Sequence, residues 1–305
     1  MKAVRFNEYG DSSVLEIVDV ERPALGDHDV AVAVRAAGIN PGEAKIRSGA
    51  LHDQFPATFP SGEGSDLAGV VLEVGAAVTE WNAGDEVFGW TDARASHAEE
   101  VVVPAGQLVR KPPALSWEVA GSLFVAGSTA WAASHAIDPQ PGETVLVSAA
   151  AGGVGTLTVQ LLATTKVHVL AVASDRHRDW LARHGVEQIA YGPDLAQRVR
   201  RAAPNGVDAV IDLHGPEYVR LAVDLGVSPH RVNSVIAFAE AARIGAKTEG
   251  NAEGASTEVL RELAGRIVDG RLEAPISGRY PLDQVRAAYD ELEKGHTFGK
   301  LVLLP

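Results

Sequence analysis

Glycines between an apolar strand and an apolar helix can bind a phosphate through backbone groups alone, and residues 148–155, SAAAGGVG, have this pattern. In the fingerprint G-x-G-x-x-G, the second glycine lets the backbone approach a pyrophosphate and the third lets the helix pack on the strand. Gly152 and Gly155 take these places, with Ala150 at the first, and the helix start would offer free N–H groups. A tight turn in a packed core is the alternative interpretation. The predicted pyrophosphate contacts are Ala151, Gly152, Gly153 and Val154.

The end of the next apolar strand indicates which dinucleotide would bind. Enzymes that use NAD usually carry an acidic residue there, about twenty residues past the glycines, to hold the ribose 2′-hydroxyl. Here Ala173 and Ser174 are followed by Asp175 and Arg176. A hydroxyl and a guanidinium favour a 2′-phosphate, because arginine offers charged, forked donors. We therefore predict NADPH as the cofactor, with Ser174 and Arg176 at its 2′-phosphate. In the alternative, Arg176 only caps a solvated helix start, and Asp175 offsets its field.

Apolar strands and helical segments alternate around these motifs from about residue 116 to residue 256. The strand-like runs TVLVSA, VHVLAVAS and DAVIDL are each followed by a helical pattern. This alternation predicts βαβ units and a doubly wound parallel sheet covered on both faces. The first 120 residues instead alternate with a period near two and have turns about every ten residues, which is typical of an antiparallel, barrel-like unit. The last segments, two helices and two strands, are expected to rejoin that first unit.

Composition and charge exclude several classes of function. The formal net charge is −13, and no block of more than two consecutive Lys or Arg occurs, so a nucleic-acid partner is not expected. The chain has no cysteine, no HExxH motif and no GxSxG nucleophile elbow. Residues 144–165 are uncharged and long enough to span a bilayer, but their three glycines and five threonines argue against insertion. The first residues lack the apolar core of a signal peptide, so we expect a cytoplasmic protein without a membrane partner.

Four strings in the sequence together resemble the zinc-independent medium-chain dehydrogenase/reductases, the quinone oxidoreductase-like group. They are AAGINPGEAKIRSG (residues 36–49), PSGEGSDLAGVVLEVGAAVTEWNAGDEVFG (residues 60–89), SAAAGGVG and the ending GHTFGKLVLLP. The resemblance implies an α/β fold in which a Rossmann NADP(H)-binding domain, residues 121–257, is inserted into a GroES-like, mainly antiparallel β domain of residues 1–120 and 258–305. It also implies a homodimer or a higher homo-oligomer.

The resemblance implies a catalytic site without a metal ion. Zinc-bearing relatives have a Cys where Asn40 stands and a His where Ser65 stands, and neither residue here completes a zinc site. In the zinc-free members the Asn of the GIN string faces the nicotinamide and the substrate, which makes Asn40 the first candidate. The NPGEAK string places Glu43 and Lys45 near the same pocket. For these two residues a solvated helix face or a mutual ion pair is the alternative.

Further residues are implied on the cofactor side by family motifs. AGSTAW resembles a family motif whose Thr contacts the cofactor near the nicotinamide. The Tyr of GVEQIAY matches a family tyrosine that lies against the 2′-phosphate, and the alternative for it is an aromatic core residue. Two residues after the fifth strand border the nicotinamide, and the Lys of FGK matches the terminal GK of the family. The string QLLATTKVHV departs from the pattern because it lacks the Gly that usually ends the first Rossmann helix. The residues so implied are Thr129, Tyr191, Ala237, Phe238 and Lys300.

These observations predict an NADPH-dependent oxidoreductase that transfers hydride to a quinone or an α,β-unsaturated carbonyl. In this chemistry the cofactor supplies the reducing power, and the protein aligns the reactants and stabilises developing oxyanion charge. One alternative is a protein that binds NADP(H) in a sensing role, since a fold does not fix a function. Another is a biosynthetic role in which the pocket serves a non-redox rearrangement.

Overall fold

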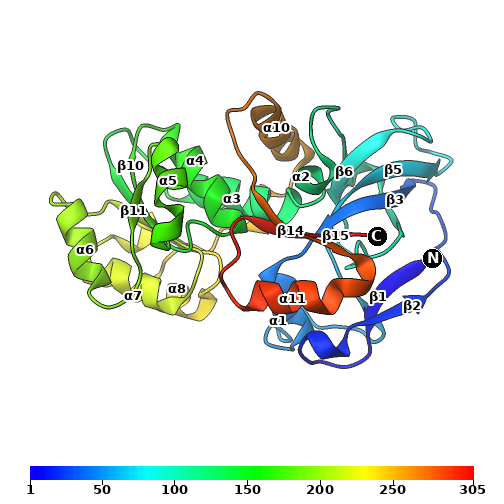
Figure 1. The fold of residues 1–305 in the computed structure, drawn as a ribbon, viewed down its shortest axis with the longest axis horizontal. Coiled ribbons are helices and arrows are strands. Elements are labelled where there is room, and N and C mark those ends of the chain that lie inside the picture. Colours follow the sequence, from blue (N-terminus) through cyan, green and yellow to red (C-terminus); the bar gives the residue numbers. More distant parts are fainter. The chain divides into compact units, whose positions relative to one another are not determined.

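The computed structural model describes residues 1–305, which divide into two compact units. Unit 1 comprises Met1–Val125 and Ser256–Pro305, and unit 2 comprises Ala126–Ala255. Figure 1 shows the elements of both units. The division predicted from the sequence lies after residues 120 and 257.

Unit 2 is built on a five-stranded parallel sheet with the strand order β11-β10-β9-β12-β13. Every pair in this sheet is parallel, and its strands are short and almost wholly buried, as their apolar sequences require. The predicted doubly wound fold is confirmed. The strands are β9 (Thr144–Val147), β10 (His168–Val172), β11 (Glu187–Ile189), β12 (Ala209–Asp212) and β13 (Val232–Ser234). A sixth strand is reduced to one parallel bridge between Asn233 and Lys247.

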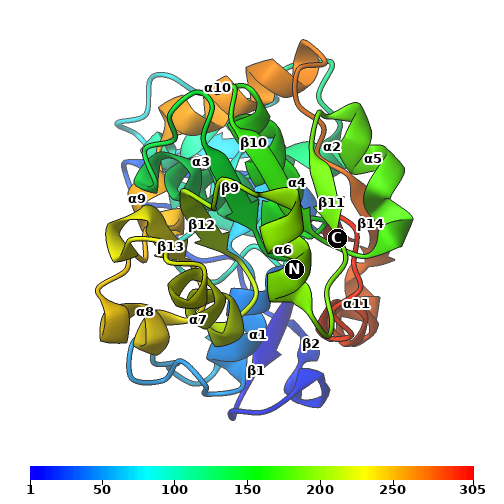
Figure 2. The same cartoon turned by 90° about the vertical axis from the view of Figure 1, so that its left-hand side faces the viewer.

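Helices cover both faces of the unit 2 sheet. The helices α6 and α7 pack on one face in a core that includes Leu146, Leu170 and Val210 of the strands. The helices α4 and α5, which connect β9 to β10 and β10 to β11, lie on the other face, as right-handed crossovers require (Figure 2). The helices are α3 (Phe124–Ala136), α4 (Gly153–Ala163), α5 (Arg178–Arg183), α6 (Leu195–Ala202), α7 (Pro216–Asp224), α8 (Phe238–Ile244) and α9 (Asn251–Gly254), with 3-10 turns at Asp175–His177 and Pro229–Arg231.

The connection from α4 to β10 shows how the chain manages without the expected glycine. Lys166 adopts a left-handed conformation with φ of 64°, and its carbonyl oxygen accepts a hydrogen bond from Gly142 N at 3.0 Å. A residue other than glycine pays about 1–2 kcal/mol for that backbone conformation. The turn is therefore kept at the cost of local strain, and its exposed lysine side chain leaves the packing of α4 undisturbed.

Unit 1 is mainly antiparallel, as predicted. A three-stranded sheet has the order β2-β1-β4, and a seven-stranded sheet has the order β14-β15-β3-β5-β6-β8, with β7 also paired to β3. Only β14 and β15 pair in parallel. The strands are β1 (Lys2–Phe6), β2 (Glu16–Asp19), β3 (Asp29–Gly38), β4 (Ser61–Gly62), β5 (Asp66–Val74), β6 (Glu86–Trp90), β7 (Glu100–Pro104), β8 (Leu108–Arg110), β14 (Ile276–Pro281) and β15 (Lys300–Leu304).

The last segment of the chain completes unit 1. Strand β15 pairs with the end of β3, where Val302 lies opposite Gly38 and Leu303 opposite Ala37. Leu303 belongs to a core shared with Phe6 of β1. This return brings residue 300 to the start of α1 in space, although 260 residues separate them in the chain. The helices of unit 1 are α1 (Pro41–Arg47), α2 (Trp117–Ala120), α10 (Thr257–Val268) and α11 (Val285–Glu293), with 3-10 turns at Ser12–Val14, Ala105–Gln107 and Leu282–Gln284.

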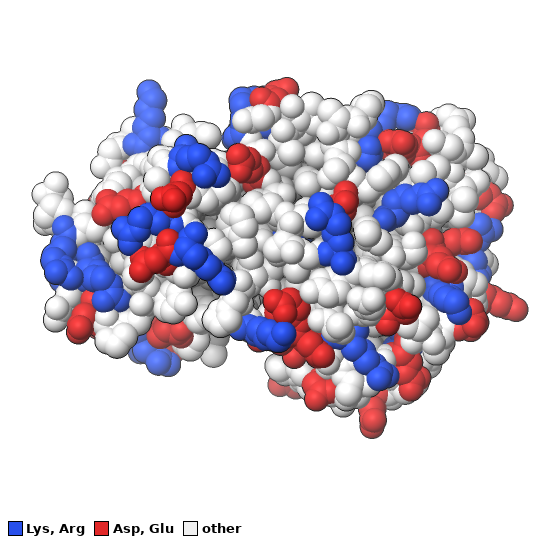
Figure 3. Space-filling model, in the orientation of Figure 1, with Lys and Arg blue, Asp and Glu red and all other residues white.

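Two properties of the whole chain bear on its partners. None of its helices combines the length and the apolar character that crossing a bilayer requires. On the face shown in Figure 3, Lys and Arg side chains are scattered among uncharged residues and interleaved with Asp and Glu. This mixed surface offers no single broad basic patch on that face.

Candidate active site

The glycine-rich turn leads from β9 directly into α4. Ala149 has φ of 45°, and its carbonyl oxygen accepts from Gly152 N at 3.0 Å, which closes the turn. A Cβ added to Gly155 would lie 2.3 Å from Ala149 O and 2.7 Å from Ala150 Cα. Only a glycine therefore lets the first turn of α4 pack this closely on the turn. Gly155 thus has the packing role that the fingerprint gives to its third glycine.

Gly152 has a different role, because the protein itself does not require a glycine there. Its φ of −77° and ψ of 179° suit any residue, and an added Cβ would come no closer than 3.4 Å to Ala149 O. Gly152 is the N-cap of α4, and no side chain caps the helix. The first N–H groups of an α-helix have no partner within the helix. These uncapped groups beside a bare backbone fit a pyrophosphate, and Ala151, Gly152, Gly153 and Val154 would hold it.

A buried carboxylate organises the loops around this turn. Asp212, at the end of β12, is fully buried, and its Oδ1 accepts from Ser148 Oγ at 2.9 Å, His214 N at 2.9 Å and Gly215 N at 3.0 Å. Its Oδ2 accepts from Ser234 Oγ at 2.7 Å. One side chain therefore ties together the carboxyl ends of β9, β12 and β13, which is the edge where open α/β sheets bind ligands.

We expect Asp212→Asn to weaken NADPH binding, because the amide cannot accept at both positions and the charge-assisted bonds are lost. Each such bond contributes about 1.5–3 kcal/mol, so a rise of about tenfold or more in the dissociation constant should follow. The quantity to measure is the quenching of protein fluorescence by NADPH. Asp208→Asn is the matched control, because Asp208 accepts from Thr144 N at 2.8 Å at the opposite end of the same strands. Equal weakening by both variants would contradict the positioning role of Asp212.

The predicted 2′-phosphate residues follow β10 and β11. Ser174 precedes the turn Asp175–His177, and Arg176 is exposed within it, with its Nε donating to His177 Nε2 at 2.9 Å. Burial, and secondarily the charge of Arg176, lower the pKa of His177, so its neutral ring can accept that bond. Tyr191 follows β11 and is 55% exposed, so it is not the aromatic core residue of the alternative interpretation. Asp175 forms an ion pair with Arg178 at 2.6 Å, so the charge of its carboxylate cancels less of the positive charge of Arg176.

The remaining cofactor candidates of unit 2 lie on helices. Thr129 is buried on α3. Ala237 is the N-cap of α8, and its N–H donates to Ser234 Oγ at 2.9 Å, which links it to the Asp212 network. Phe238 begins α8 with 36% of its surface exposed. Ala237 and Phe238 therefore follow β13 at the same carboxyl edge as the glycine turn.

Asn40 lies at the centre of a buried polar network in unit 1. Its Nδ2 donates to Asp66 Oδ2 at 2.7 Å and to Glu43 Oε1 at 3.1 Å. Its Oδ1 accepts from Lys300 Nζ at 2.5 Å. Lys300, predicted as a cofactor contact, therefore lies in unit 1 beside the leading catalytic candidate. The amide protons of Asn40 are both engaged within the protein.

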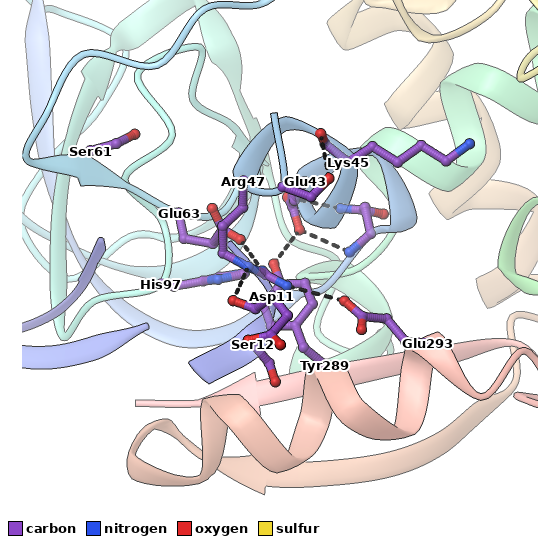
Figure 4. Close-up of polar contacts among 12 residues, drawn as sticks. Asp11, Ser12, Glu43, Lys45, Arg47, Ser61, Glu63, His97, Tyr289 and Glu293 are labelled. Carbon is purple, nitrogen blue, oxygen red and sulfur yellow. Dashed lines mark hydrogen bonds and ion pairs between the residues drawn. The ribbon is translucent and has the colours of Figure 1, made fainter. Parts of the chain in front are cut away.

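Glu43 is a buried cap of α1 and not part of a solvated helix face. Its Oε2 accepts from Asn40 N at 2.8 Å, in a capping box, and from Tyr289 Oη at 2.9 Å. Its Oε1 accepts from Ser65 N at 3.0 Å. These bonds make Glu43 a positioning residue for Asn40. The side chain of Lys45, two residues on, is half-buried and extends away from Glu43 (Figure 4).

Charged side chains continue the network below α1. Arg47 is fully buried, with Nη1 2.6 Å from Glu63 Oε1 and Nη2 3.2 Å from Glu293 Oε1, and its guanidinium lies 4.3 Å from the ring centroid of Tyr289 (Figure 4). Burial, followed by the charge of Glu43, raises the pKa of Glu63 to about 8, although Arg47 acts against this. The negative charge of the carboxyl groups in this network is therefore not fully balanced by its positive side chains.

The hydrogen-bonded side chains around Asn40 stand where zinc-bearing relatives have their zinc ligands. Asn40 and Ser65 stand at the two ligand positions, and the structure brings no three His, Cys, Asp or Glu side chains together in a geometry that could hold a metal ion. The nearby His97 is fully buried, its Nε2 lies 3.1 Å from Gly38 O, and burial lowers its pKa. The oxygens near Asn40 that could bind a metal ion already accept hydrogen bonds within the protein. Asn40 Oδ1 accepts from Lys300, Glu43 Oε1 from Ser65 N, and Asp66 Oδ2 from Asn40 Nδ2.

The structure thus brings Asn40, Glu43 and Lys300 together, and the side chain of Lys45 extends away from Glu43. Sequence reasoning missed the residues that hold these groups in place. Asp66 directly follows Ser65, which stands at a zinc-ligand position, and an acidic residue beside that motif could have indicated a role in the site. Asp212 ends an apolar strand, which is a second such signal, but no spacing connects Tyr289 to α1. The missed residues are Arg47, Glu63, Asp66, Ser148, Asp212, Ser234 and Tyr289.

A parallel sheet with a glycine turn at its carboxyl edge, together with a mainly antiparallel β unit, defines a two-domain dehydrogenase of the nucleotide-binding type. Family models agree: residues 26–113 match the alcohol dehydrogenase GroES-like domain, and residues 184–303 match the zinc-binding dehydrogenase domain. The quinone oxidoreductase of Pseudomonas aeruginosa is 30% identical over 328 residues, covering 100% of this chain and 99% of that protein. The chain belongs to the quinone oxidoreductase family of medium-chain dehydrogenase/reductases, which confirms the resemblance seen in its motifs.

Solved structures have the same fold over the whole chain. The quinone oxidoreductase of Coxiella burnetii aligns with a TM-score of 0.89 and 31% identity, covering 100% of this chain and 99% of that one. The quinone oxidoreductase of Escherichia coli, solved in complex with NADPH, aligns with a TM-score of 0.87 and 24% identity over 100% of both chains. At that identity the second likeness shows the fold alone.

Proposed function

We propose that this protein is an NADPH-dependent oxidoreductase that transfers hydride to a quinone or an α,β-unsaturated carbonyl without a metal ion. The observation that carries the proposal is the uncapped start of α4 at Gly152, where an added Cβ would meet nothing closer than Ala149 O at 3.4 Å. Ser174 and Arg176, in place of an acidic residue after β10, favour the phosphorylated cofactor. The quinone oxidoreductases among its relatives support the acceptor class.

The protein's own residues bind and orient the reactants in this proposal. Reduced nicotinamide supplies the hydride when it is bound. The turn at Gly152 would hold the pyrophosphate, Arg176 and Tyr191 the 2′-phosphate, and Thr129 and Ala237 would border the nicotinamide. Asp212 fixes the loops that carry these contacts.

Asn40 and Ser65, at the two ligand positions, support the metal-independent part of the proposal. Without a metal ion, the negative charge that develops on the acceptor oxygen must be stabilised by hydrogen-bond donors or by a cation. Asn40, Lys45 and Lys300 are the candidates in unit 1. Water can protonate a hydroquinone anion, whereas an enone also needs a proton at its α-carbon.

The direct test is the loss of NADPH absorbance in the presence of a panel of quinones and enones. We expect turnover with members of both classes, and unchanged rates after dialysis against a chelator and after addition of Zn²⁺. Tight NADPH binding without oxidation by any acceptor would favour the non-redox sensing or biosynthetic alternative. A rate that falls on chelation and returns with zinc would contradict metal independence.

We expect Arg176→Ala to weaken NADPH binding by about 1–3 kcal/mol, because one charge-assisted contact to the 2′-phosphate is lost, and to leave NADH binding nearly unchanged. Titration calorimetry with both cofactors measures the difference. Arg178→Ala is the control, since Arg178 is a neighbouring guanidinium paired with Asp175. Equal losses for NADPH and NADH would show that Arg176 does not contact the 2′-phosphate.

The family also suggests the setting in which this activity would occur. We propose a cytoplasmic homodimer or higher homo-oligomer whose partner is a small-molecule acceptor. Sedimentation velocity at several protein concentrations would determine the oligomeric state, and a single monomeric species throughout would contradict this part of the proposal.

A further inference from the structure

The hydrogen bonds of Asn40 leave its amide without a free donor for a substrate. Both Nδ2 protons are used, one by Asp66 Oδ2 at 2.7 Å and one by Glu43 Oε1 at 3.1 Å. A primary amide has two donor protons, so a third acceptor would have to displace one of these buried carboxylates. Because both competing acceptors are carboxylates, the amide is held in place more firmly than a neutral carbonyl oxygen could hold it.

Lys300, in contrast, retains a donor. Its Nζ donates to Ile39 O at 2.9 Å and to Asn40 Oδ1 at 2.5 Å, while Asp66 Oδ2 lies 4.0 Å away, beyond hydrogen-bond distance. An ammonium group has three protons, so one makes no hydrogen bond within the protein, although Asp66 remains an ion-pair partner at this distance. The side chain is 9% exposed, so it is largely but not wholly buried.

Hydrogen bonds of the backbone and of Nζ hold Lys300 in place. Lys300 is the first residue of β15, its N–H donates to Pro275 O at 2.9 Å, and Ser277 Oγ donates to its carbonyl oxygen at 3.3 Å. The two acceptors of Nζ belong to the segment that joins β3 to α1. The ammonium is thus held by two acceptors before any ligand binds, which is the preorganisation that charge stabilisation needs.

We propose that Lys300 is the catalytic residue that hydrogen-bonds the acceptor's carbonyl oxygen, on which negative charge develops during hydride transfer. This inference rests on the proposed function and names the group that replaces a metal ion in it. When reduced nicotinamide is bound, its hydride would add, with its electron pair, to a carbon conjugated to the carbonyl, and the π electrons would move to the oxygen that Lys300 contacts. A proton from water would then complete the saturated ketone. With a quinone, the ring carbon that received the hydride would also lose its proton while the second carbonyl oxygen gains one, which completes the hydroquinone.

The alternative is that Lys300 only neutralises Asp66. Burial raises the pKa of Asp66, and the charge of Lys300 is the largest influence that lowers it. A double-mutant cycle separates the two roles. Asp66→Asn removes the carboxylate charge, so a purely neutralising lysine would have no further effect in that background. A lysine that contacts the acceptor would still be needed.

The test compares Lys300→Gln, Asp66→Asn and the double variant. Glutamine keeps a neutral donor near Asn40 and so favours folding. We expect Lys300→Gln to lower kcat by about 10²- to 10³-fold in both backgrounds, with NADPH affinity unchanged and a larger loss for enones than for quinones. A double variant as active as Asp66→Asn alone would overturn the proposal. So would a loss of NADPH affinity at constant kcat, which would make Lys300 a cofactor contact.

A cofactor-free measurement keeps this inference distinct from the proposed function. 4-Nitrophenol carries its charge on a phenolate oxygen, and its ionisation is visible in its absorbance. The wild-type protein should bind the phenolate and lower the apparent pKa of the phenol, and Lys300→Gln should abolish that shift.

Lys111→Met is the matched control, because Lys111 is also buried and is paired with Glu86 at 2.9 Å in the same unit. It should leave the phenol shift and kcat unchanged. A shift that persists in Lys300→Gln would overturn the assignment of Lys300. Failure of the wild-type protein to oxidise NADPH with any acceptor, together with a normal phenol shift, would overturn only the proposed function.

Discussion

Replacing Arg47 by methionine should lower the free energy of unfolding by about 3–5 kcal/mol, the cost of removing one partner from a buried ion pair. Arg47 is fully buried and contacts Glu63, Glu293 and the ring of Tyr289. Methionine fills similar volume, but it leaves Glu63, which is 1% exposed, without its counter-ion. Above about pH 8, where Glu63 of the wild type is ionised, its carboxylate must then remain charged in an apolar setting or bind a proton, and both are unfavourable. Urea unfolding at that pH, followed by circular dichroism, measures the loss.

The control for this prediction is Glu63→Gln, which keeps an acceptor for Arg47 and removes the charge. The pKa of Glu63 is about 8 in the folded protein and 4.5 as a reference value, so the folded state binds more protons between these two pH values. The unfolding free energy of the wild type should therefore fall as the pH rises from about 5 to about 8, and the fall should be smaller in Glu63→Gln. A loss below about 1 kcal/mol for Arg47→Met would contradict the role of the buried pair.

Alanine in place of Gly152 should weaken NADPH binding by about 10- to 100-fold while leaving the melting temperature nearly unchanged. The protein accommodates the added Cβ, whose nearest neighbour would be Ala149 O at 3.4 Å. The same methyl group would lie at the N-cap of α4, where the fingerprint requires close approach of backbone and pyrophosphate. Affinity measured by fluorescence quenching and stability measured by calorimetry together give the result.

Gly155→Ala is the companion variant, and its expected outcome is different. Its Cβ would lie 2.3 Å from Ala149 O, so α4 must shift and both stability and NADPH affinity should fall. A stability loss of about 1–3 kcal/mol is typical of overpacking. If Gly152→Ala proved as destabilising as Gly155→Ala, or bound NADPH normally, the phosphate role of Gly152 would be wrong.

The elements of the fold were predictable wherever local pattern decides local structure. Apolar strands such as β9 and β12 must be buried on both faces, and their alternation with helices leaves a parallel sheet as the economical solution. The turn at Gly152 was predictable because its glycines directly join a strand to a helix. The sequence showed only that the usual glycine is missing before β10. It did not show that Lys166 takes the left-handed backbone conformation in its place.

The site was predictable to a smaller extent. The motif containing Asn40 indicated which residue to consider, but it could not show that both protons of the amide are already engaged. Glu43 was placed near the pocket, whereas its bonds to Asn40, Ser65 and Tyr289 make it a buried cap. Lys300 was assigned to the cofactor through its motif, and its hydrogen bonds place it beside Asn40.

The sequence by itself determined the class of fold, the position of the phosphate turn and the absence of Cys and His at the zinc-ligand positions, because each depends on residues that are neighbours in the chain. Only the tertiary structure decided which donor remains for a substrate. That answer depends on pairs far apart in sequence, such as Asn40 with Lys300 and Glu43 with Tyr289. Hydrogen-bond donors are few and each can be used only once, so their availability is known only when all their partners are in place.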